Sequence, residues 1–475
     1  MANVITAPQY DPIVTAKNLA TKAVAAQQDK LTKQTALANN TATALNNLKL
    51  AMSAFQSSMS TMSSSTKSLL SQSATFSNTT YGSGSADATA VAGSYSFFVQ
   101  QLATASQTSY GGLTSSPAAG SGSLTVRIGD PLAAATPDNS FQIDLTAADK
   151  DADGTLTPQE IAAAINGDSK NNSRVTASIV TIGNQSQLVM TSNLTGKDNA
   201  VTLDASSVTN TTLTKALVTD AAVNVKEVVK AQDAIVWLGA KDTGTQITQA
   251  SNTFTNVTGV KMTFTKAMNT GDAPVTVTVA TDSGGTATNV QAFVDAYNKL
   301  KSVLDGLASS GDPDKNVAAG IFAHDSGLNA LRSNMNNLLR QSVGGVSLVS
   351  YGVTANRDGT LSLNTAKLTA KLASNPGDLD KLFGNNSLSA PSGVLGSLDK
   401  ALSQWSNITK GQLVQRLDAN TSLQKSLGKS TALLTTQYDT AYKRFLDQFT
   451  RLQVMQEQMY KTVDMFDAMF GNDKS

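Results

Sequence analysis

FLDQFTRLQVMQEQMYKTVDMFDAMF, residues 445–470, is the stretch that decides how this chain folds. Its apolar residues recur at spacings of four, three, seven, four, three and four, at Phe445, Phe449, Leu452, Met459, Val463, Phe466 and Phe470. This is a heptad pattern, typical of a helix that packs along another helix, and Gln456 fills the one position without an apolar residue. We call these residues the C-terminal seam. A helix so apolar on one stripe needs a second helix to cover it.

A second heptad pattern, the N-terminal seam, lies near the other end of the chain. It consists of Leu45, Leu48, Met52, Phe55, Met59, Met62 and Leu69, with Thr66 at its one polar position. The same frame continued backwards holds weaker residues, at Val24, Gln27, Leu31, Gln34, Ala38 and Thr41. We therefore predict a helix over residues 12–70, with the first 40 or so flexible before assembly. We expect residues 45–69 to cover the C-terminal seam; an ordinary helix on its own core is the alternative.

The region between these helical ends has the two-residue period of β-strands. Apolar residues alternate within residues 124–128, 141–145, 175–179, 260–264 and 275–279. Residues 224–230 are predicted to be helical and to separate two β-rich domains. Helical spacing returns after residue 288, broken by a small hairpin with Asp358-Gly359 as its turn and Leu361 and Leu363 on its second strand.

These patterns predict an α+β multidomain fold, with a helical, coiled-coil stalk made of both chain termini and β-rich head domains inserted in the middle. The predicted domains are N-terminal leg helices (1–75), a β-rich head domain (76–223), a second β-rich head segment (224–288), a helical leg domain with the hairpin (289–410) and C-terminal coiled-coil helices that pair with the N-terminal segment (411–475).

Composition excludes several classes of function. Charged residues are 15% of the 475, and the net charge is +1, so the chain has no broad electrostatic field for nucleic acid or anionic membranes. There is no cysteine and one histidine, which argues against disulfides, thiol chemistry and zinc. Residues 1–14 lack the pattern of a Sec-type signal, and no apolar run is long enough to span a bilayer. Such a chain suits either the cytoplasm or export in an unfolded state.

The sharpest local motif is DKDADGTLTPQE, residues 149–160. Asp149, Asp151 and Asp153 hold positions one, three and five of an EF-hand calcium loop, Thr155 holds position seven and Glu160 holds position twelve. Ca²⁺ prefers such oxygen ligands, and glycine at position six permits the sharp turn. We therefore expect a structural calcium ion here, with no cofactor otherwise required.

The alternative for this motif is a solvated acidic turn that caps the following helix, with Thr157 as N-cap and Glu160 as its partner. Residues 354–365 serve as a control. They share the Asp-Gly turn but have Thr354 at position one and Thr365 at position twelve, so we expect them to bind no metal.

No constellation in the sequence indicates an enzyme. His324-Asp325-Ser326 are consecutive, and three consecutive side chains do not form a catalytic triad. We expect His324 to precede a helix that Asp325 or Ser326 caps. Trp237 and Trp405 are expected to serve packing.

Several segments, in this order and spacing, resemble the flagellar filament cap family, hook-associated protein 2. They are residues 92–95 and 97–103, 232–234, 251–254, 257–260, 293–298, 351–353, 358–361 and 444–459. Trp237-Leu238-Gly239 departs from the family pattern, and the calcium motif is not a general feature of that family.

The resemblance implies a non-enzymatic protein that is exported by the flagellar secretion apparatus without a cleaved signal peptide. It would form a homo-oligomeric ring at the distal filament tip, outside the cell, and guide the insertion of flagellin. Its partners would be its own copies, flagellin and other axial flagellar proteins, and a cytosolic export chaperone, but neither nucleic acid nor a membrane. The alternatives are a surface adhesin whose β-rich head binds a host glycan, and another axial component such as a junction protein.

Overall fold

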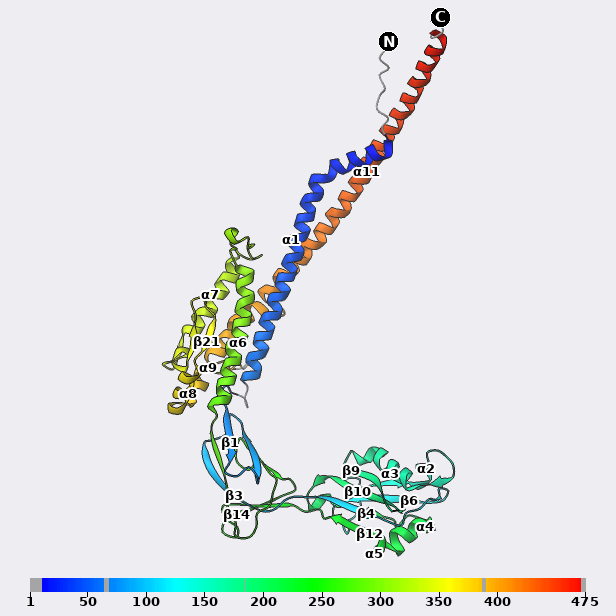
Figure 1. Ribbon diagram of the computed structural model, residues 1–475, viewed down its shortest axis with the longest axis vertical. Coiled ribbons are helices and arrows are strands. Elements are labelled where there is room, and N and C mark those ends of the chain that lie inside the picture. Colours follow the sequence, from blue (N-terminus) through cyan, green and yellow to red (C-terminus); the bar gives the residue numbers. More distant parts are fainter. Residues whose placement is uncertain (1–10, 64–67, 184, 387–389, 471–475) are drawn as a thin grey trace. The chain divides into compact units, whose positions relative to one another are not determined.

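The computed structural model describes residues 11–63, 68–183, 185–386 and 390–470. The chain divides into two compact units (Figure 1). Unit 1 combines residues 1–65 with residues 287–475, and unit 2 consists of residues 66–286. The predicted α+β organisation is confirmed, because both chain ends are long helices of one unit and the β-rich part lies between them in sequence. Within the described residues no helix has both the length and the hydropathy needed to span a bilayer.

The two longest helices of unit 1 are α1 (Pro12–Met62) and α11 (Gln412–Phe470). The Asp11 carboxylate caps α1 by accepting hydrogen bonds from the N–H groups of Ile13 and Val14, at 2.8 and 3.3 Å. The helix ends at Met62 rather than near residue 70, so the predicted end was wrong. Ser63 there has an extended backbone, and its hydroxyl donates to the Gly384 carbonyl at 2.9 Å.

This early end removes the last part of the predicted N-terminal seam from the helix. Leu69 is buried but lies beyond α1, and Thr66 falls outside the described residues. Serine and threonine dominate residues 60–68, and their side chains compete for backbone hydrogen bonds, which weakens a helix interior.

The rest of unit 1 is a helical domain with two small hairpins. Its helices are α6 (Ser283–Ala308), which begins at the end of unit 2, α7 (Ser326–Arg340), α8 (Thr365–Ser374), α9 (Gly377–Phe383) and α10 (Gly393–Ser406), with 3-10 turns at Pro313–Lys315 and Leu348–Tyr351. The hairpins are β18 (Ser342–Val343) with β19 (Val346–Ser347), and β20 (Val353–Ala355) with β21 (Leu361–Leu363). The predicted Asp358-Gly359 hairpin is confirmed.

Unit 2 contains an eight-stranded antiparallel sheet in the order β14-β13-β3-β17-β1-β2-β16-β15. Its strands are β1 (Gln72–Phe76), β2 (Gly82–Ala86), β3 (Gly93–Gln101), β13 (Ala234–Leu238), β14 (Thr245–Gln249), β15 (Thr253–Phe254), β16 (Val260–Phe264) and β17 (Val275–Thr281). Phe264 lies at the centre of its core, with ring centroids 5.8 Å from Phe76, 5.8 Å from Phe97 and 5.2 Å from Phe254.

The remainder of unit 2, residues 105–229, forms further sheets with a separate core. The four-stranded sheet contains β12 (Val225–Val229), β4 (Ala105–Tyr110), β10 (Gln185–Thr195) and β9 (Val175–Ile182); the three-stranded sheet contains β11 (Val201–Asp204), β6 (Ser123–Ile128) and β7 (Ser140–Asp144); and β5 (Ser116–Pro117) pairs with β8 (Thr155–Leu156). The helical segments are α2 (Leu145–Ala148), α3 (Pro158–Gly167), α4 (Thr211–Thr214) and α5 (Ala221–Asn224), with a π-helical turn at Lys215–Thr219 and 3-10 turns at Ser169–Asn171 and Lys197–Asn199.

Two local predictions in this part were wrong. Residues 225–229 form strand β12, which pairs with β4, instead of a helix. Valine at 225, 228 and 229 favours a strand. The segment is so short that its pattern of polar and apolar residues fits the period of a helix as well as that of a strand. Leu145, expected at the end of a strand, is the first residue of α2, because the Asp144 carboxylate accepts the N–H groups of Thr146 and Ala147.

The predicted borders at residues 76 and 224 do not coincide with the sheets. Residues 72–101 share the eight-stranded sheet with residues 234–281, so that β1 pairs with β17 from Gln72↔Thr281 to Phe76↔Val277. Residues 105–229 are therefore an insertion between strands β3 and β13 of one sheet. Sequence spacing did not reveal this arrangement, because pairing partners so distant in sequence leave no local signal.

The N-terminal end of α11 is held by an ion pair and a cation–π contact, both formed by Arg416. The Arg416 guanidinium donates to both oxygens of Asp325, at 2.7 and 3.0 Å, and lies 4.9 Å from the centre of the Trp405 ring. Asp325 also caps α7 by accepting the Leu328 N–H at 2.8 Å, as predicted for the residue after His324. The hydrogen bonds from Arg416 are the largest cause of a lowered pKa at Asp325. One guanidinium thus joins α11 to α7 and α10.

We predict that Arg416→Ala lowers the free energy of unfolding of unit 1 by about 2 kcal/mol, because Asp325 loses its charge-assisted hydrogen bonds. The matched control is Arg451→Ala on the same helix. Its ion pair with Asp447 has side chains 79% and 60% exposed, and we expect a change below about 0.5 kcal/mol. Urea unfolding followed by far-UV circular dichroism measures both. Equal effects of the two substitutions would contradict this assignment.

The same ion pair predicts a pH dependence. Because the pKa of Asp325 is lowered in the folded chain, its contribution to stability is present above the unfolded carboxyl value of about 3.9. It is lost as the pH falls through the lowered folded value. The difference in stability between wild type and Arg416→Ala should therefore shrink as the pH is lowered from 5 to 3, roughly the range over which such carboxyls titrate. A difference that stays constant over this range refutes the assignment.

Candidate functional site

Helices α1 and α11 pair along part of their length in an antiparallel arrangement (Figure 1). The Asn420 amide donates to the Ala38 carbonyl at 3.0 Å, and the Gln424 amide donates to Asn39 Oδ1 at 2.9 Å. Leu31, Ala38, Leu427 and Leu434 form the apolar core of the pair, with Val24 packed against it. Along the pair, the residue number in α1 decreases as that in α11 increases, so the two helices are antiparallel. Asn420 is buried, and its bond to one particular carbonyl favours this register over others.

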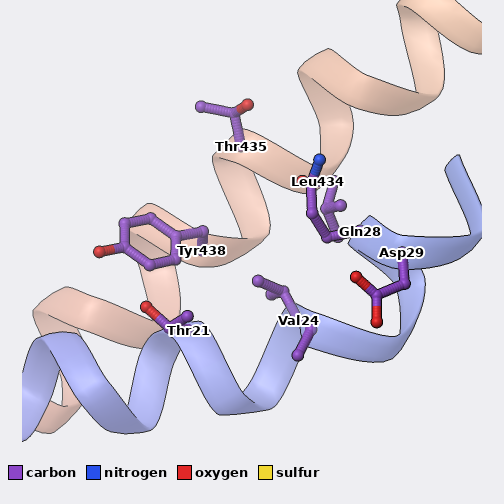
Figure 2. Close-up of a pocket in the computed structure, with 8 residues that line it drawn as sticks. Thr21, Val24, Gln28, Asp29, Leu434, Thr435 and Tyr438 are labelled. Atoms are coloured by element: carbon purple, nitrogen blue, oxygen red, sulfur yellow. The ribbon is translucent and has the colours of Figure 1, made fainter. Parts of the chain in front are cut away.

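The outer part of this pair contains a cavity between the two helices. Its volume is about 340 Å³, and it is lined by Thr21, Val24, Ala25, Gln28, Asp29, Leu434, Thr435 and Tyr438. Figure 2 shows Val24 of α1 and Leu434 of α11 pointing into the same space, with the Tyr438 ring above Thr21. Small and polar residues supply much of the α1 side of this cavity, whereas Val24 and Leu434 also belong to the apolar core of the pair.

The N-terminal seam does not cover the C-terminal seam, so the predicted pairing of residues 45–69 was wrong. Leu45, Leu48, Met52, Phe55 and Met59 are all buried, and Met62 is half-buried. Phe55, however, packs on α6, with ring centroids 6.3 Å from Phe293 and 6.5 Å from Tyr297. Gln56 donates to Asp399 of α10 at 2.9 Å. The large seam residues thus build the core of unit 1, whereas the weak frame at Val24, Leu31 and Ala38 packs on α11.

Most of the described residues of the C-terminal seam are exposed. Phe445 and Phe449 are half-buried, but Leu452 is 40%, Met459 62%, Val463 50% and Phe466 53% exposed. Phe470 belongs to α11, and its side chain is outside the described residues. Continuing the antiparallel register places Pro12, the first residue of α1, opposite about Asp447. The last turns of α11 therefore continue past the start of α1 (Figure 1).

Exposed apolar residues also lie off the predicted stripe. Met455 is 59%, Met465 55% and Met469 62% exposed. The heptad reasoning missed them because it followed one face only; their signal was the high methionine content of residues 455–469. Flexible methionine side chains adapt to irregular partner surfaces. Many exposed apolar side chains on one helix segment are typical of an interaction site. We call residues 452–469 the exposed helix end.

The 149–160 loop brings its three predicted aspartates together. Carboxylate oxygens of Asp149, Asp151 and Asp153 lie within 4.8 Å of one another. Asp149 Oδ2 accepts the Gly154 N–H at 2.9 Å, and Gly154 has φ of +82°, the left-handed region that glycine favours. Asp151 accepts from the N–H of Asp153, which lowers its pKa, but lost hydration and the nearby carboxylates outweigh this and raise the pKa overall.

Glu160 takes part in a helix cap in this structure. Its Oε2 accepts the Thr157 N–H at 2.8 Å, and Thr157 Oγ1 accepts the Glu160 N–H at 3.3 Å, which is the capping box expected from the alternative interpretation. Glu160 Oε1 accepts the Lys150 N–H at 3.1 Å. The hydrogen bonds from Thr157 are the largest cause of a lowered pKa at Glu160. Glu160 therefore folds back over the start of the loop.

The control loop differs from this arrangement. Asp358 Oδ1 accepts both the N–H and the hydroxyl of Thr360, at 2.9 and 2.6 Å, and Thr354 Oγ1 lies 3.1 Å from the Ser362 hydroxyl. Among the described residues, the one group of three carboxylate, histidine or cysteine side chains close enough to share a metal ion is at residues 149–153.

The remaining residues singled out in the sequence are His324, Trp237 and Trp405. His324 is exposed and precedes α7. Trp405 is buried beneath Arg416, whereas Trp237 is half-buried and donates from its ring nitrogen to Gln100 at 2.8 Å. Packing is thus confirmed for Trp405, and also for Trp237, which packs against the core of the eight-stranded sheet.

Comparisons with known proteins agree on one family. The family model described as flagellar hook-associated protein 2 C-terminus matches residues 231–461, and the model of its N-terminus matches residues 14–106. The lateral flagellar hook-associated protein 2 of Vibrio parahaemolyticus is 31% identical over 398 residues, which are 84% of this chain and 86% of that protein. The flagellar hook-associated protein 2 of Escherichia coli K12 is 26% identical over 447 residues, covering 91% of this chain and 90% of that protein.

A solved structure supports the same assignment. The D1-D2-D3 domains of the flagellar cap protein FliD from Escherichia coli match 80% of this chain and 99% of that chain, with a TM-score of 0.58 and 25% identity. Sequence and fold point the same way over most of the length. The chain belongs to the flagellar hook-associated protein 2 family.

Proposed function

We propose that this protein is a non-enzymatic flagellar filament cap, which forms a homo-oligomeric ring at the distal tip and guides the insertion of exported flagellin. The exposed helix end carries the proposal. Burial of apolar surface is worth about 25 cal/mol per Å². Contact between residues 452–469 and another helix is therefore stabilising. Their heptad spacing suits a helical partner better than a flat surface. Relatives named hook-associated protein 2 and flagellar cap protein support the same role.

Helix-on-helix contact explains how such an end would guide assembly. The α1–α11 pair has a cavity between its outer parts and the buried Asn420 as its main polar contact. A pair of this kind presents one long apolar helix to neighbouring subunits without being tightly closed by its own partner. Flagellin helices and neighbouring cap subunits are the partners that we propose for it.

The proposal includes the route of the protein. Export through the flagellar secretion apparatus, without a cleaved signal peptide, fits a chain that has no cysteine to form disulfides on the way. Before export, a cytosolic chaperone would cover the exposed helix end, because free apolar helices self-associate. The working location is the extracellular tip of the flagellum. Other axial proteins of the flagellum are its neighbours there.

Glycan binding by the β-rich unit is the competing function. The two functions are distinguished by binding of the full chain to a panel of immobilised mucin glycans. A filament cap without adhesin activity gives no saturable signal. Saturable binding that a deletion of residues 105–229 removes would support the adhesin instead.

We predict that deletion of residues 440–475 abolishes filament growth, because it removes the exposed helix end and the seam that leads to it. Residues 66–286 form a separate compact unit, so their β-sheet signal in circular dichroism should persist. Cells carrying the truncated protein should release monomeric flagellin into the medium, as measured by immunoblot, and show no filaments in electron micrographs. Filaments of normal length on such cells would refute the proposal. Deletion of residues 1–40 should have the same effect, because it removes the α1 residues that pair with α11.

A finer prediction uses Met459→Glu combined with Phe466→Glu. Both side chains are more than half exposed, so the stability of the isolated chain should change by less than about 0.5 kcal/mol. Filament growth should fall strongly, because the charges oppose burial against a partner helix. Lys461→Glu, on a charged position of the same helix segment, is the matched control and should leave motility near wild type. Normal swimming of the double variant would show that this surface is not used.

A further inference from the structure

The 149–160 loop contains a polar atom that the protein itself does not satisfy. Asp149 Oδ1 is buried and has no hydrogen-bond partner, although Oδ2 of the same carboxylate accepts the Gly154 N–H. Among the described residues, three buried side-chain atoms lack a partner, and Asp149 Oδ1 is the one within this loop; Ser116 Oγ, on the strand paired with β8, is another. Ser116 is 3% exposed and lies on β5, opposite Leu156 of the loop's strand β8. Burying a carboxylate oxygen without a partner is costly, which indicates a missing one.

The charge of the loop indicates the sign of that missing partner. The three carboxylates lie within 4.8 Å of one another, and none of them takes part in an ion pair among the described residues. Their mutual repulsion is stronger at the partly buried Asp149 than in open water, because the local dielectric is lower. A cation coordinated by all three would remove the repulsion and occupy the free lone pair of Asp149 Oδ1.

We infer that residues 149–160 bind one calcium ion, with Asp149, Asp151 and Asp153 as carboxylate ligands. A purely acidic surface turn requires neither the buried oxygen nor the spacing of the twelve residues. The glycine turn at position six and the carbonyl of Thr155 at position seven complete the EF-hand order of oxygen ligands. Calcium accepts six to eight oxygens in a flexible geometry, which suits this loop better than the rigid octahedron of magnesium.

Glu160 serves both the cap and the ion. A carboxylate offers about four lone-pair sites. Besides the Lys150 N–H, the Asp151 N–H also bonds to the Glu160 carboxylate, so the ion would replace one of these two hydrogen bonds while Oε2 keeps the bonds to Thr157. The capping box then positions the twelfth ligand instead of competing with the ion.

The ion would fix the connection between two helices that cover the sheets. Helix α2 ends at Ala148, immediately before the loop, and α3 begins at Pro158 within it. Leu156, Ile161 and Ile165 are at most 2% exposed and belong to the same core as Leu145 of α2. We expect a dissociation constant of about 0.1–1 mM, the range of extracellular calcium modules. The site would therefore fill in a calcium-containing medium, and this inference does not depend on the filament-cap proposal.

The test is a titration of CaCl₂ into the full chain by isothermal calorimetry, together with thermal unfolding in CaCl₂ and in chelator. Wild type should bind one equivalent and melt at a higher temperature with calcium. Asp151→Asn/Asp153→Asn keeps the side-chain acceptors for the N–H groups of Asp153 and Thr155 but removes two charges. This variant should lose at least about tenfold in affinity and show no calcium-dependent shift. Equal melting of wild type in calcium and chelator, or an unchanged shift in the variant, would overturn the inference.

Thr157→Ala is the matched control for the cap. It removes the hydroxyl that bonds to Glu160 but leaves the three aspartates in place. This variant should melt at a lower temperature than wild type in both solutions and retain its calcium-dependent shift. A shift that disappears in Thr157→Ala while the double aspartate variant keeps it would assign the effect to helix capping and refute the metal site. MgCl₂ at the same concentration should give a smaller shift than CaCl₂.

Discussion

The antiparallel contact between α1 and α11 is the interaction on which the rest of unit 1 depends. It brings together residues 382 positions apart in the chain, through the bond from Asn420 to the Ala38 carbonyl. Loop closure over such a length costs entropy that grows only slowly with length, but that cost must still be offset by packing. The Arg416–Asp325 pair at the base of α11 and the leucine core near Leu427 supply that packing. Because α1 begins at Pro12, the same register places no described residue of α1 opposite the last turns of α11.

Residue size separates the two halves of α1. Large residues at 45–59 lie where α1 meets α6 and α10, since a core formed by several helices has more volume to fill. Val24, Leu31 and Ala38 lie where α1 meets a single other helix, α11. Heptad spacing alone does not distinguish these two environments. Both satisfy the same seam pattern, and the stronger seam was therefore assigned to the wrong partner.

The sequence was sufficient for what local chemistry determines. Alternating residues located β6, β9, β16 and β17, Asp325 was recognised as a helix cap, and the 149–160 spacing located the carboxylate cluster. The sequence was insufficient where a segment's structure depends on a pairing partner far away in the chain. The pairing of β1 with β17 joins residues more than 200 positions apart, and nothing near Gln72 or Thr281 identifies the other. The helical expectation for 225–229 failed for the same reason, because β4 supplies the hydrogen bonds that make this segment a strand.

The exposed helix end and the 149–160 loop need different partners. The first bears on assembly and the second on the stability of unit 2. At the exposed helix end the unsatisfied surface is apolar and lies in solvent, so covering it requires another polypeptide. At the 149–160 loop the unsatisfied atom is a single buried carboxylate oxygen, which an ion from solution can reach without any second chain. Filling the loop would stabilise unit 2 by itself, whereas the exposed helix end of unit 1 would be covered only in the assembly that we propose. The chain can thus complete the fold of its β-rich part while the paired helices remain available for assembly.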